Sequence, residues 1–166
     1  STAFDFPASV VAGYAFKPTE KWKIEFNADW TQWNKVDDVT IHFDTPGMAD
    51  AVSQENLHNT MAYKIGAEYL YSEKMTLRAG YIYNENATPE DTWRPSQPDT
   101  DMHFFLAGFG YRFKHVVVDT AFQLVYYEKR TIDNNVDQNE NFSSSSIDGT
   151  YETLAPCVSI GATYNF

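Results

Sequence analysis

The sequence lacks the features that build three common classes of protein. Its single cysteine, Cys157, excludes an internal disulfide bond. No stretch approaches the roughly 18 consecutive apolar residues of a membrane helix, which excludes a helical membrane protein. Only 12 Lys and Arg stand against 23 Asp and Glu, and a net charge of −11 argues against nucleic acid as a partner.

The sequence also lacks a recognisable centre for chemistry. The four histidines are scattered along the chain, and no Gly-x-Ser-x-Gly motif occurs. The serine-rich stretch 142–149 is typical of a flexible loop rather than a nucleophile site. Asp101 and His103 do not have a spacing specific for a metal. We therefore predict no catalytic residue, no metal site and no cofactor.

What the sequence does contain is a strict alternation of side chains. In the last ten residues, "CVSIGATYNF", every second residue from Val158 to Phe166 is apolar or aromatic, and the residues between them are small or polar. This period of two predicts a strand with one apolar and one polar face. The same pattern recurs along the chain and predicts seven strands, at 7–17, 21–43, 57–72, 74–84, 101–113, 115–130 and 150–166.

The connections between these strands alternate in length. Short turns ("KPTEK", "SEK" and "KH") alternate with long acidic segments at 44–56, 85–100 and 129–149. Tight turns at one end and large loops at the other are typical of a bacterial outer-membrane barrel. The sequence therefore predicts an all-β fold, an antiparallel transmembrane β-barrel in the bacterial outer membrane.

The aromatic residues support the same interpretation, because they gather at two levels of the expected barrel wall. Such belts mark the two membrane interfaces. The expected belt near the short turns contains Phe16, Trp22, Tyr71, Phe113, Tyr164 and Phe166, and the belt near the long loops contains Trp30, Tyr63, Tyr83, Phe105 and Tyr126. The apolar face is thus expected to contact outer-membrane lipids and lipopolysaccharide.

Keeping like faces together also predicts the pairing of neighbouring strands. A hairpin centred on "SEK" opposes Tyr71 to Met75 on the apolar face and Glu68 to Arg78 on the polar face. A two-residue turn at 114–115 opposes Tyr111 to Val118, and Trp22 is expected to face Phe16.

The odd number of strands raises the question of closure. Single-chain bacterial barrels close with an even number of strands, and an open edge in lipid leaves costly unpaired backbone groups. The chain is therefore expected to be part of a larger barrel. The alternative is a complete eight-stranded barrel with an adhesin or structural role, if the change of phase near 34–35 is a turn. A soluble β-rich binding protein is a third possibility, but it leaves the two aromatic belts without a purpose.

Several motifs resemble the FadL/TodX-type outer-membrane transporters. They are "DWTQW" (29–33), "AYKIGAEYLYSEKMTLRAGYIYNENATP" (62–89), "PDTDMHFFLAGFGYRF" (98–113) and the terminal "YNF". The resemblance implies uptake of long-chain fatty acids or other hydrophobic small molecules through a 14-stranded barrel. It implies that residues 1–166 are the C-terminal portion of that barrel domain, with the N-terminal hatch and the first barrel half absent. Its partners are then the substrate and the remaining half of the same barrel.

The predicted inward face supplies the candidate substrate-binding residues. Lys64 and Arg78 are candidates to orient an anionic head group, while pairing with acids of a wet interior is the alternative. The Glu68–Arg78 opposition favours the structural role for Arg78, whereas Lys64 has no obvious acid across the strand. Trp33 is a candidate for contact with an apolar ligand or for packing under the loops. Phe104 and Leu106 are candidates for contact with substrate or for packing of the hatch. Charges expected to be structural are Glu68, Arg112 and Asp119.

Overall fold

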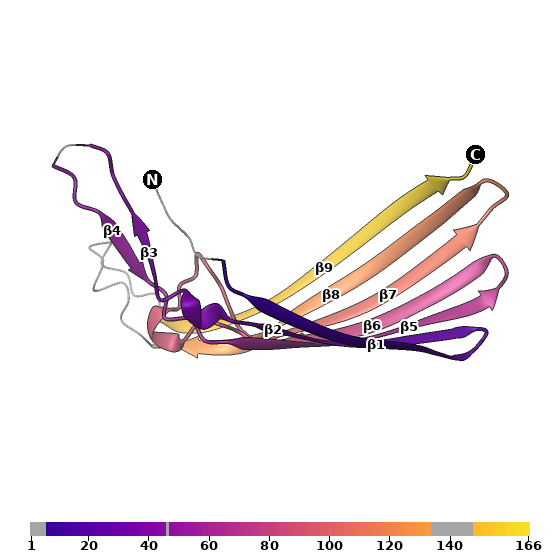
Figure 1. Cartoon of the computed structure of the whole chain (residues 1–166), viewed down its shortest axis with the longest axis horizontal. Coiled ribbons are helices and arrows are strands. Elements are labelled where there is room, and N and C mark those ends of the chain that lie inside the picture. Colours follow the sequence, from indigo (N-terminus) through magenta and orange to yellow (C-terminus); the bar gives the residue numbers. More distant parts are fainter. Residues whose placement is uncertain (1–5, 46, 134–147) are drawn as a thin grey trace.

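A computed structural model describes residues 6–45, 47–133 and 148–166 of the chain. Seven antiparallel strands form one curved sheet in the order β1-β2-β5-β6-β7-β8-β9 (Figure 1). Apart from β2 and β5, which are separated by two further strands, adjacent strands of the sheet are consecutive in the chain. Their bounds are β1 Ser9–Thr19, β2 Trp22–Thr31, β5 Thr60–Ser72, β6 Met75–Asn84, β7 Met102–Arg112, β8 Val116–Ile132 and β9 Gly149–Tyr164. The predicted all-β class, the antiparallel pairing and the seven-stranded sheet are confirmed.

A small hairpin extends from the loop end of the sheet (Figure 1). It pairs β3 (Asp38–Ile41) with β4 (Ala51–Gln54) in a separate two-stranded sheet. The prediction of one strand over 21–43 is therefore wrong in its extent. The chain leaves the large sheet at Thr31 and turns through a 3₁₀ helix, η1 (Trp33–Lys35), where the phase changes.

Hydrogen bonds explain why the chain turns at this point. The backbone N–H of Val36 donates to the Trp33 carbonyl at 2.8 Å, and the N–H of Asn34 donates to the Asn59 side chain at 3.1 Å. Among the residues that the structure describes, none beyond the turn adds an eighth strand to the large sheet, so the complete eight-stranded barrel is not favoured. In the described part of the chain, no helix has the length and apolar character needed to cross a membrane.

The observed register confirms two of the four predicted pairs and corrects the other two. Glu68 lies opposite Arg78, and Tyr111 lies opposite Val118. The Tyr71–Met75 pair is wrong, because an irregularity after Leu70 places Met75 opposite Ser72. The Trp22–Phe16 pair is also wrong. Phe16 faces Ile24 and Thr19 faces Trp22, with a register shift at Pro18, a residue that has no N–H to donate to the ladder.

The apolar side chains cover one face of the sheet and do not gather into a packed core. In the described ranges only five apolar residues are buried, and Trp93 and Ile132, the most buried, belong to the loop end. By contrast, the side chains of Val158 and Ile160 on β9 are 75% and 77% exposed. An apolar face as wide as the sheet is suited to contact with lipid.

Aromatic rings touch at both ends of this outer face. At the short-turn end, the ring centroids of Trp22 and Tyr69 lie 4.6 Å apart and those of Tyr111 and Phe113 lie 4.7 Å apart. At the loop end, the ring centroids of Tyr81 and Phe105 lie 5.4 Å apart. Bands of this kind are the expected arrangement for a wall that meets water at two levels.

The two faces predict opposite responses to the same substitution. Ala107 lies on the outer face of β7, and Ala121, on the adjacent strand β8, lies on the inner face opposite Gly108. In the full-length protein in phospholipid bilayers, Ala107→Arg should lower the free energy of unfolding by about 2–4 kcal/mol, because it places a charge in lipid. Ala121→Arg should have a much smaller effect. Equal losses in denaturant unfolding would contradict the assignment of faces.

Candidate functional site

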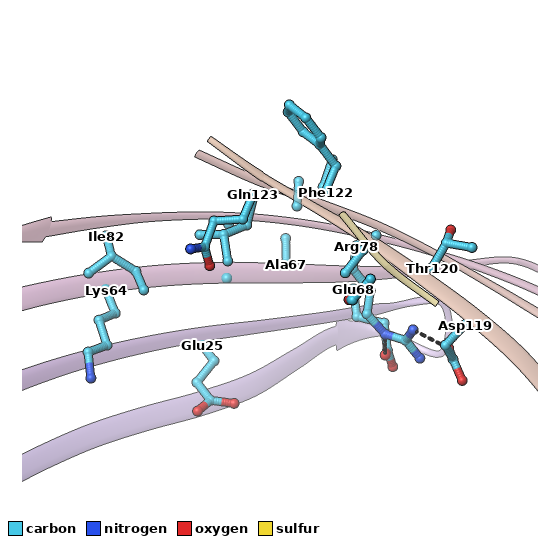
Figure 2. Close-up of a pocket in the computed structure, with 18 of the residues that line it drawn as sticks. Glu25, Lys64, Ala67, Glu68, Arg78, Ile82, Asp119, Thr120, Phe122 and Gln123 are labelled. Atoms are coloured by element: carbon cyan, nitrogen blue, oxygen red, sulfur yellow. Dashed lines mark hydrogen bonds and ion pairs between the residues drawn. The ribbon is translucent and has the colours of Figure 1, made fainter. Parts of the chain in front are cut away.

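The concave inner face of the sheet carries a hollow of about 950 Å³, which we call the wall hollow (Figure 2). Alternation places every second residue of β2 and of β5 to β9 on this face, and many of them are glycine, alanine or serine. Side chains that shape it are Ile82, Leu106, Gln123 and Cys157, with charges from Lys23, Glu25, Lys64, Glu68, Arg78 and Asp119. The result is a surface with bare backbone and apolar patches between charged groups.

Arg78 is held between two carboxylates. Its Nε donates to Glu68 Oε2 at 2.7 Å, and its Nη1 donates to Asp119 Oδ1 at 2.8 Å (Figure 2). The predicted cross-strand Glu68–Arg78 pair is therefore present. Arg112 lies opposite Val117 near the short turns, which places it diagonally from Asp119 as expected. The Asp119 carboxylate forms its ion pair with Arg78.

Lys64 does have an acidic partner, which corrects the sequence interpretation. Its Nζ forms an ion pair with Asp29 Oδ2. Lys64 lies opposite Asn27 on β2, and Asp29 is the next residue on the same face, so the contact is diagonal. The other oxygen, Asp29 Oδ1, is buried and has no hydrogen-bond partner among the described residues. The third cation that lines the wall hollow is Lys23, and its Nζ lies 3.4 Å from Glu25 Oε2.

The apolar candidates separate into different places. Leu106 lies in the wall hollow opposite Gly80, together with Lys64 and Arg78. Phe104 shares the inner face but does not line that hollow; it lies opposite Ile82 and the buried Val125.

Trp33 lies in η1 and lines a second hollow of about 500 Å³ below the loops, which we call the loop-side hollow. Its lining also includes Asp29, Thr31, Thr60, Asn84 and Gln97. Lys64 lines both hollows, so the Lys64–Asp29 pair stands at the boundary between them.

The segment 85–100 over the loop end is held by a network that sequence reasoning missed. Asp99 Oδ2 accepts hydrogen bonds from the backbone N–H groups of Ala87 and Thr88 at 2.8 and 2.9 Å. The Arg130 guanidinium donates to the carbonyl oxygens of Thr88 and Asp99 at 2.8 and 2.9 Å. The only signal in the sequence is the "PDTD" stretch, because aspartates before a strand often bind nearby backbone groups.

Asp101 continues this network just before β7. Partial burial raises the pKa of its carboxyl, but hydrogen bonds from the Tyr83 hydroxyl and from the backbone and side chain of Asn86 outweigh burial, so the pKa lies below its usual value. A lowered pKa means that the carboxylate stabilises the loop above the ordinary aspartate pKa. That contribution is lost as pH falls through the lowered value.

Comparison with known proteins places this geometry in context. A family model described as "Outer membrane protein transport protein (OMPP1/FadL/TodX)" matches residues 1–166. The chain is 30% identical over 122 residues to a 47 kDa outer membrane protein of Pasteurella multocida, covering 73% of this chain and 28% of that protein. It is 25% identical over 143 residues to the long-chain fatty acid transport protein of Escherichia coli K12, covering 84% of this chain and 31% of that protein.

Two solved structures share the fold. A Pseudomonas aeruginosa FadL homologue matches with a TM-score of 0.77 at 24% identity, over 99% of this chain and 37% of that one. The Ralstonia pickettii toluene transporter TbuX matches with a TM-score of 0.62 at 19% identity, over 97% of this chain and 34% of that one. The chain thus spans about a third of the length of these relatives.

The loop network predicts a local effect of Asp99→Ala. Removing the carboxylate leaves two backbone N–H groups without their acceptor, which should lower the local opening free energy of the loop by about 1–3 kcal/mol. Hydrogen exchange of the Ala87 and Thr88 amides in the full-length protein measures this change. Asp91→Ala is the control, because Asp91 is exposed on the same segment. Unchanged exchange at Ala87 and Thr88 would show that Asp99 does not hold the loop.

Proposed function

Because the chain belongs to the OMPP1/FadL/TodX family of outer-membrane transport proteins, we propose that it takes part in uptake of long-chain fatty acids or other hydrophobic small molecules. The family consists of transport proteins rather than enzymes, and it places the chain in the bacterial outer membrane. The long-chain fatty acid transport protein of E. coli and the toluene transporter of R. pickettii motivate the two substrate classes.

The wall hollow is the observation that carries this proposal. A purely water-filled pore needs a polar lining, whereas this inner face combines Ile82 and Leu106 with bare glycine backbone. Small-molecule sites are concave and mostly apolar, with a few placed polar groups. A hydrophobic molecule is therefore expected to lie against Leu106 while the charged pairs border it.

The two edges of the sheet support assembly into a larger barrel. In the described residues β1 pairs only with β2, and β9 pairs only with β8, so each leaves one edge without a partner. Unpaired backbone groups cost several kcal/mol each in lipid. We infer that the remaining half of the same barrel supplies the missing partners, and that the outer face contacts membrane lipids with lipopolysaccharide at the loop end.

The ion pairs bear on the choice between acidic and neutral substrates. Each of the three cations that line the wall hollow already has a carboxylate partner within the chain. A fatty-acid carboxylate would have to compete with Asp29 for Lys64. A neutral hydrophobic molecule has no such competition, and it is the substrate class that this part of the wall favours.

Filling the wall hollow should reduce uptake. We expect Leu106→Trp in the full-length protein to slow uptake of labelled 1-hexadecanol by cells that lack other uptake proteins, because the indole occupies the space left by Gly80 and its neighbours. Leu77→Trp is the matched control, since Leu77 lies on the outer face and is already 36% exposed. Equal uptake by the two variants, at equal amounts in the membrane, would argue against the wall hollow as the path.

Releasing Lys64 should shift the preference toward acids. Asp29→Asn removes the carboxylate while keeping the shape, so Lys64 becomes available to an anionic head group. The ratio of palmitate to 1-hexadecanol uptake should rise about threefold to tenfold, the size of a charge-assisted contact of about 1 kcal/mol. Because the two probes share a chain of equal length, an unchanged ratio would show that Lys64 does not meet the head group.

A further inference from the structure

The side chain of Arg78 crosses a neighbouring strand. Arg78 belongs to β6 and its partner Asp119 to β8, so β7 lies between them. Two strand spacings separate the backbones by about 9.5 Å. An extended arginine, its 2.8 Å hydrogen bond and the aspartate side chain together span this distance. The ladder places Gly108 opposite Arg78 and Gly110 opposite Asp119. The guanidinium therefore reaches Asp119 by lying over the two glycines of β7.

These two glycines leave the space that Arg78 uses. A Cβ on Gly110 would lie 2.6 Å from Asp119 Oδ1 and 3.2 Å from Arg78 Nη1. A Cβ on Gly108 would lie 3.4 Å from the Cβ of Arg78. By contrast, a Cβ on Gly161, on the other side of Asp119 in the same row of the ladder, would meet nothing within 4 Å. In the row of the ladder that contains Asp119, the crowding thus lies on the β7 side, over which the arginine passes, whereas the contact at Gly108 is an ordinary van der Waals distance.

We propose that Gly108 and Gly110 are positioning residues that keep Arg78 flat against the wall and its guanidinium out of the passage. The inference rests on the proposed uptake function. Glu68 and Asp119 hold the guanidinium from both sides, and the missing side chains of β7 let it lie low. The wall hollow then stays wide beside Leu106, which favours substrates of large cross-section.

The test compares Gly110→Ala with Gly161→Ala in the full-length protein. The added methyl at position 110 meets the ends of two side chains rather than backbone, so the variant should fold while the Arg78–Asp119 contact is displaced. Uptake of naphthalene should fall about threefold or more relative to the slimmer 1-hexadecanol, a size typical of coupled neighbours. Gly161→Ala should leave the ratio of the two rates unchanged, because its added methyl faces the same hollow but meets neither Arg78 nor Asp119 within 4 Å.

A second substitution separates positioning from a merely structural role. If a raised Arg78 obstructs the passage, Arg78→Ala in the Gly110→Ala background should restore naphthalene uptake. Failure of this rescue, or equal loss of both probes, would overturn the proposal.

A measurement that does not depend on transport distinguishes failure of the glycine proposal from failure of the proposed uptake function. Cys157 lines the same hollow, so its alkylation rate with a small and a bulky maleimide reports the open cross-section. The experiment uses the full-length protein with any cysteine outside residues 1–166 replaced by serine. Gly110→Ala should slow the alkylation of Cys157 by the bulky maleimide and leave alkylation by the small one unchanged. This result does not depend on transport, so it is expected even if the wild-type protein takes up neither naphthalene nor 1-hexadecanol. Equal alkylation of both glycine variants by the bulky reagent would reject the role of Gly110.

Discussion

The structure depends on one requirement: in hydrocarbon, every backbone N–H and C=O must be bonded within the protein. The antiparallel ladder meets this requirement between neighbouring strands from β1 to β9, except along the outer edges of those two strands, and it forces successive side chains onto opposite faces. Lipid then selects apolar residues on one face only. The other face is free to carry glycine, carboxylates and cations, and the wall hollow occupies that face. A slip of one residue in any strand would exchange the two faces of that strand, so the register controls both the membrane surface and the inner surface.

The ion pairs of the inner face matter for geometry more than for stability. The side chains of Glu68, Arg78 and Asp119 are each a little under half exposed, and ion pairs open to water contribute at most about 1 kcal/mol. What they do determine is where a long side chain lies. An unpaired arginine would sample the centre of the barrel, whereas Arg78 between two acids lies along the wall. The bare backbone of β7 makes that placement possible, so glycine and charge act together on this face.

Local periodicity explains what the sequence predicted, and contacts between distant segments explain what it did not. The seven strands of the large sheet and their two faces follow from the alternation of side chains along the chain. The Glu68–Arg78 pair follows from the same alternation within one hairpin closed by a tight turn. The Lys64–Asp29 pair requires the register of β2 against β5, two strands separated by the β3–β4 hairpin, and no local pattern encodes it. Likewise, the contacts of Arg130 join the loop end of β8 to residues 86–99, a segment without periodicity that lies far from it in the sequence.

The wall hollow and the loop-side hollow meet at the Lys64–Asp29 ion pair. Trp33 and the ordered segment 85–100 border the loop-side hollow, while Leu106 and the glycines border the wall hollow. Lys64 lines both, with Asp29 against it. Any molecule that moved along this wall from the loops toward the short turns would pass the pair. Because Asp29 keeps one buried oxygen without a partner in the described residues, the site retains an acceptor as well as a cation. Its charge balance therefore bears on passage more directly than that of the Arg78 cluster, which lies nearer the short turns.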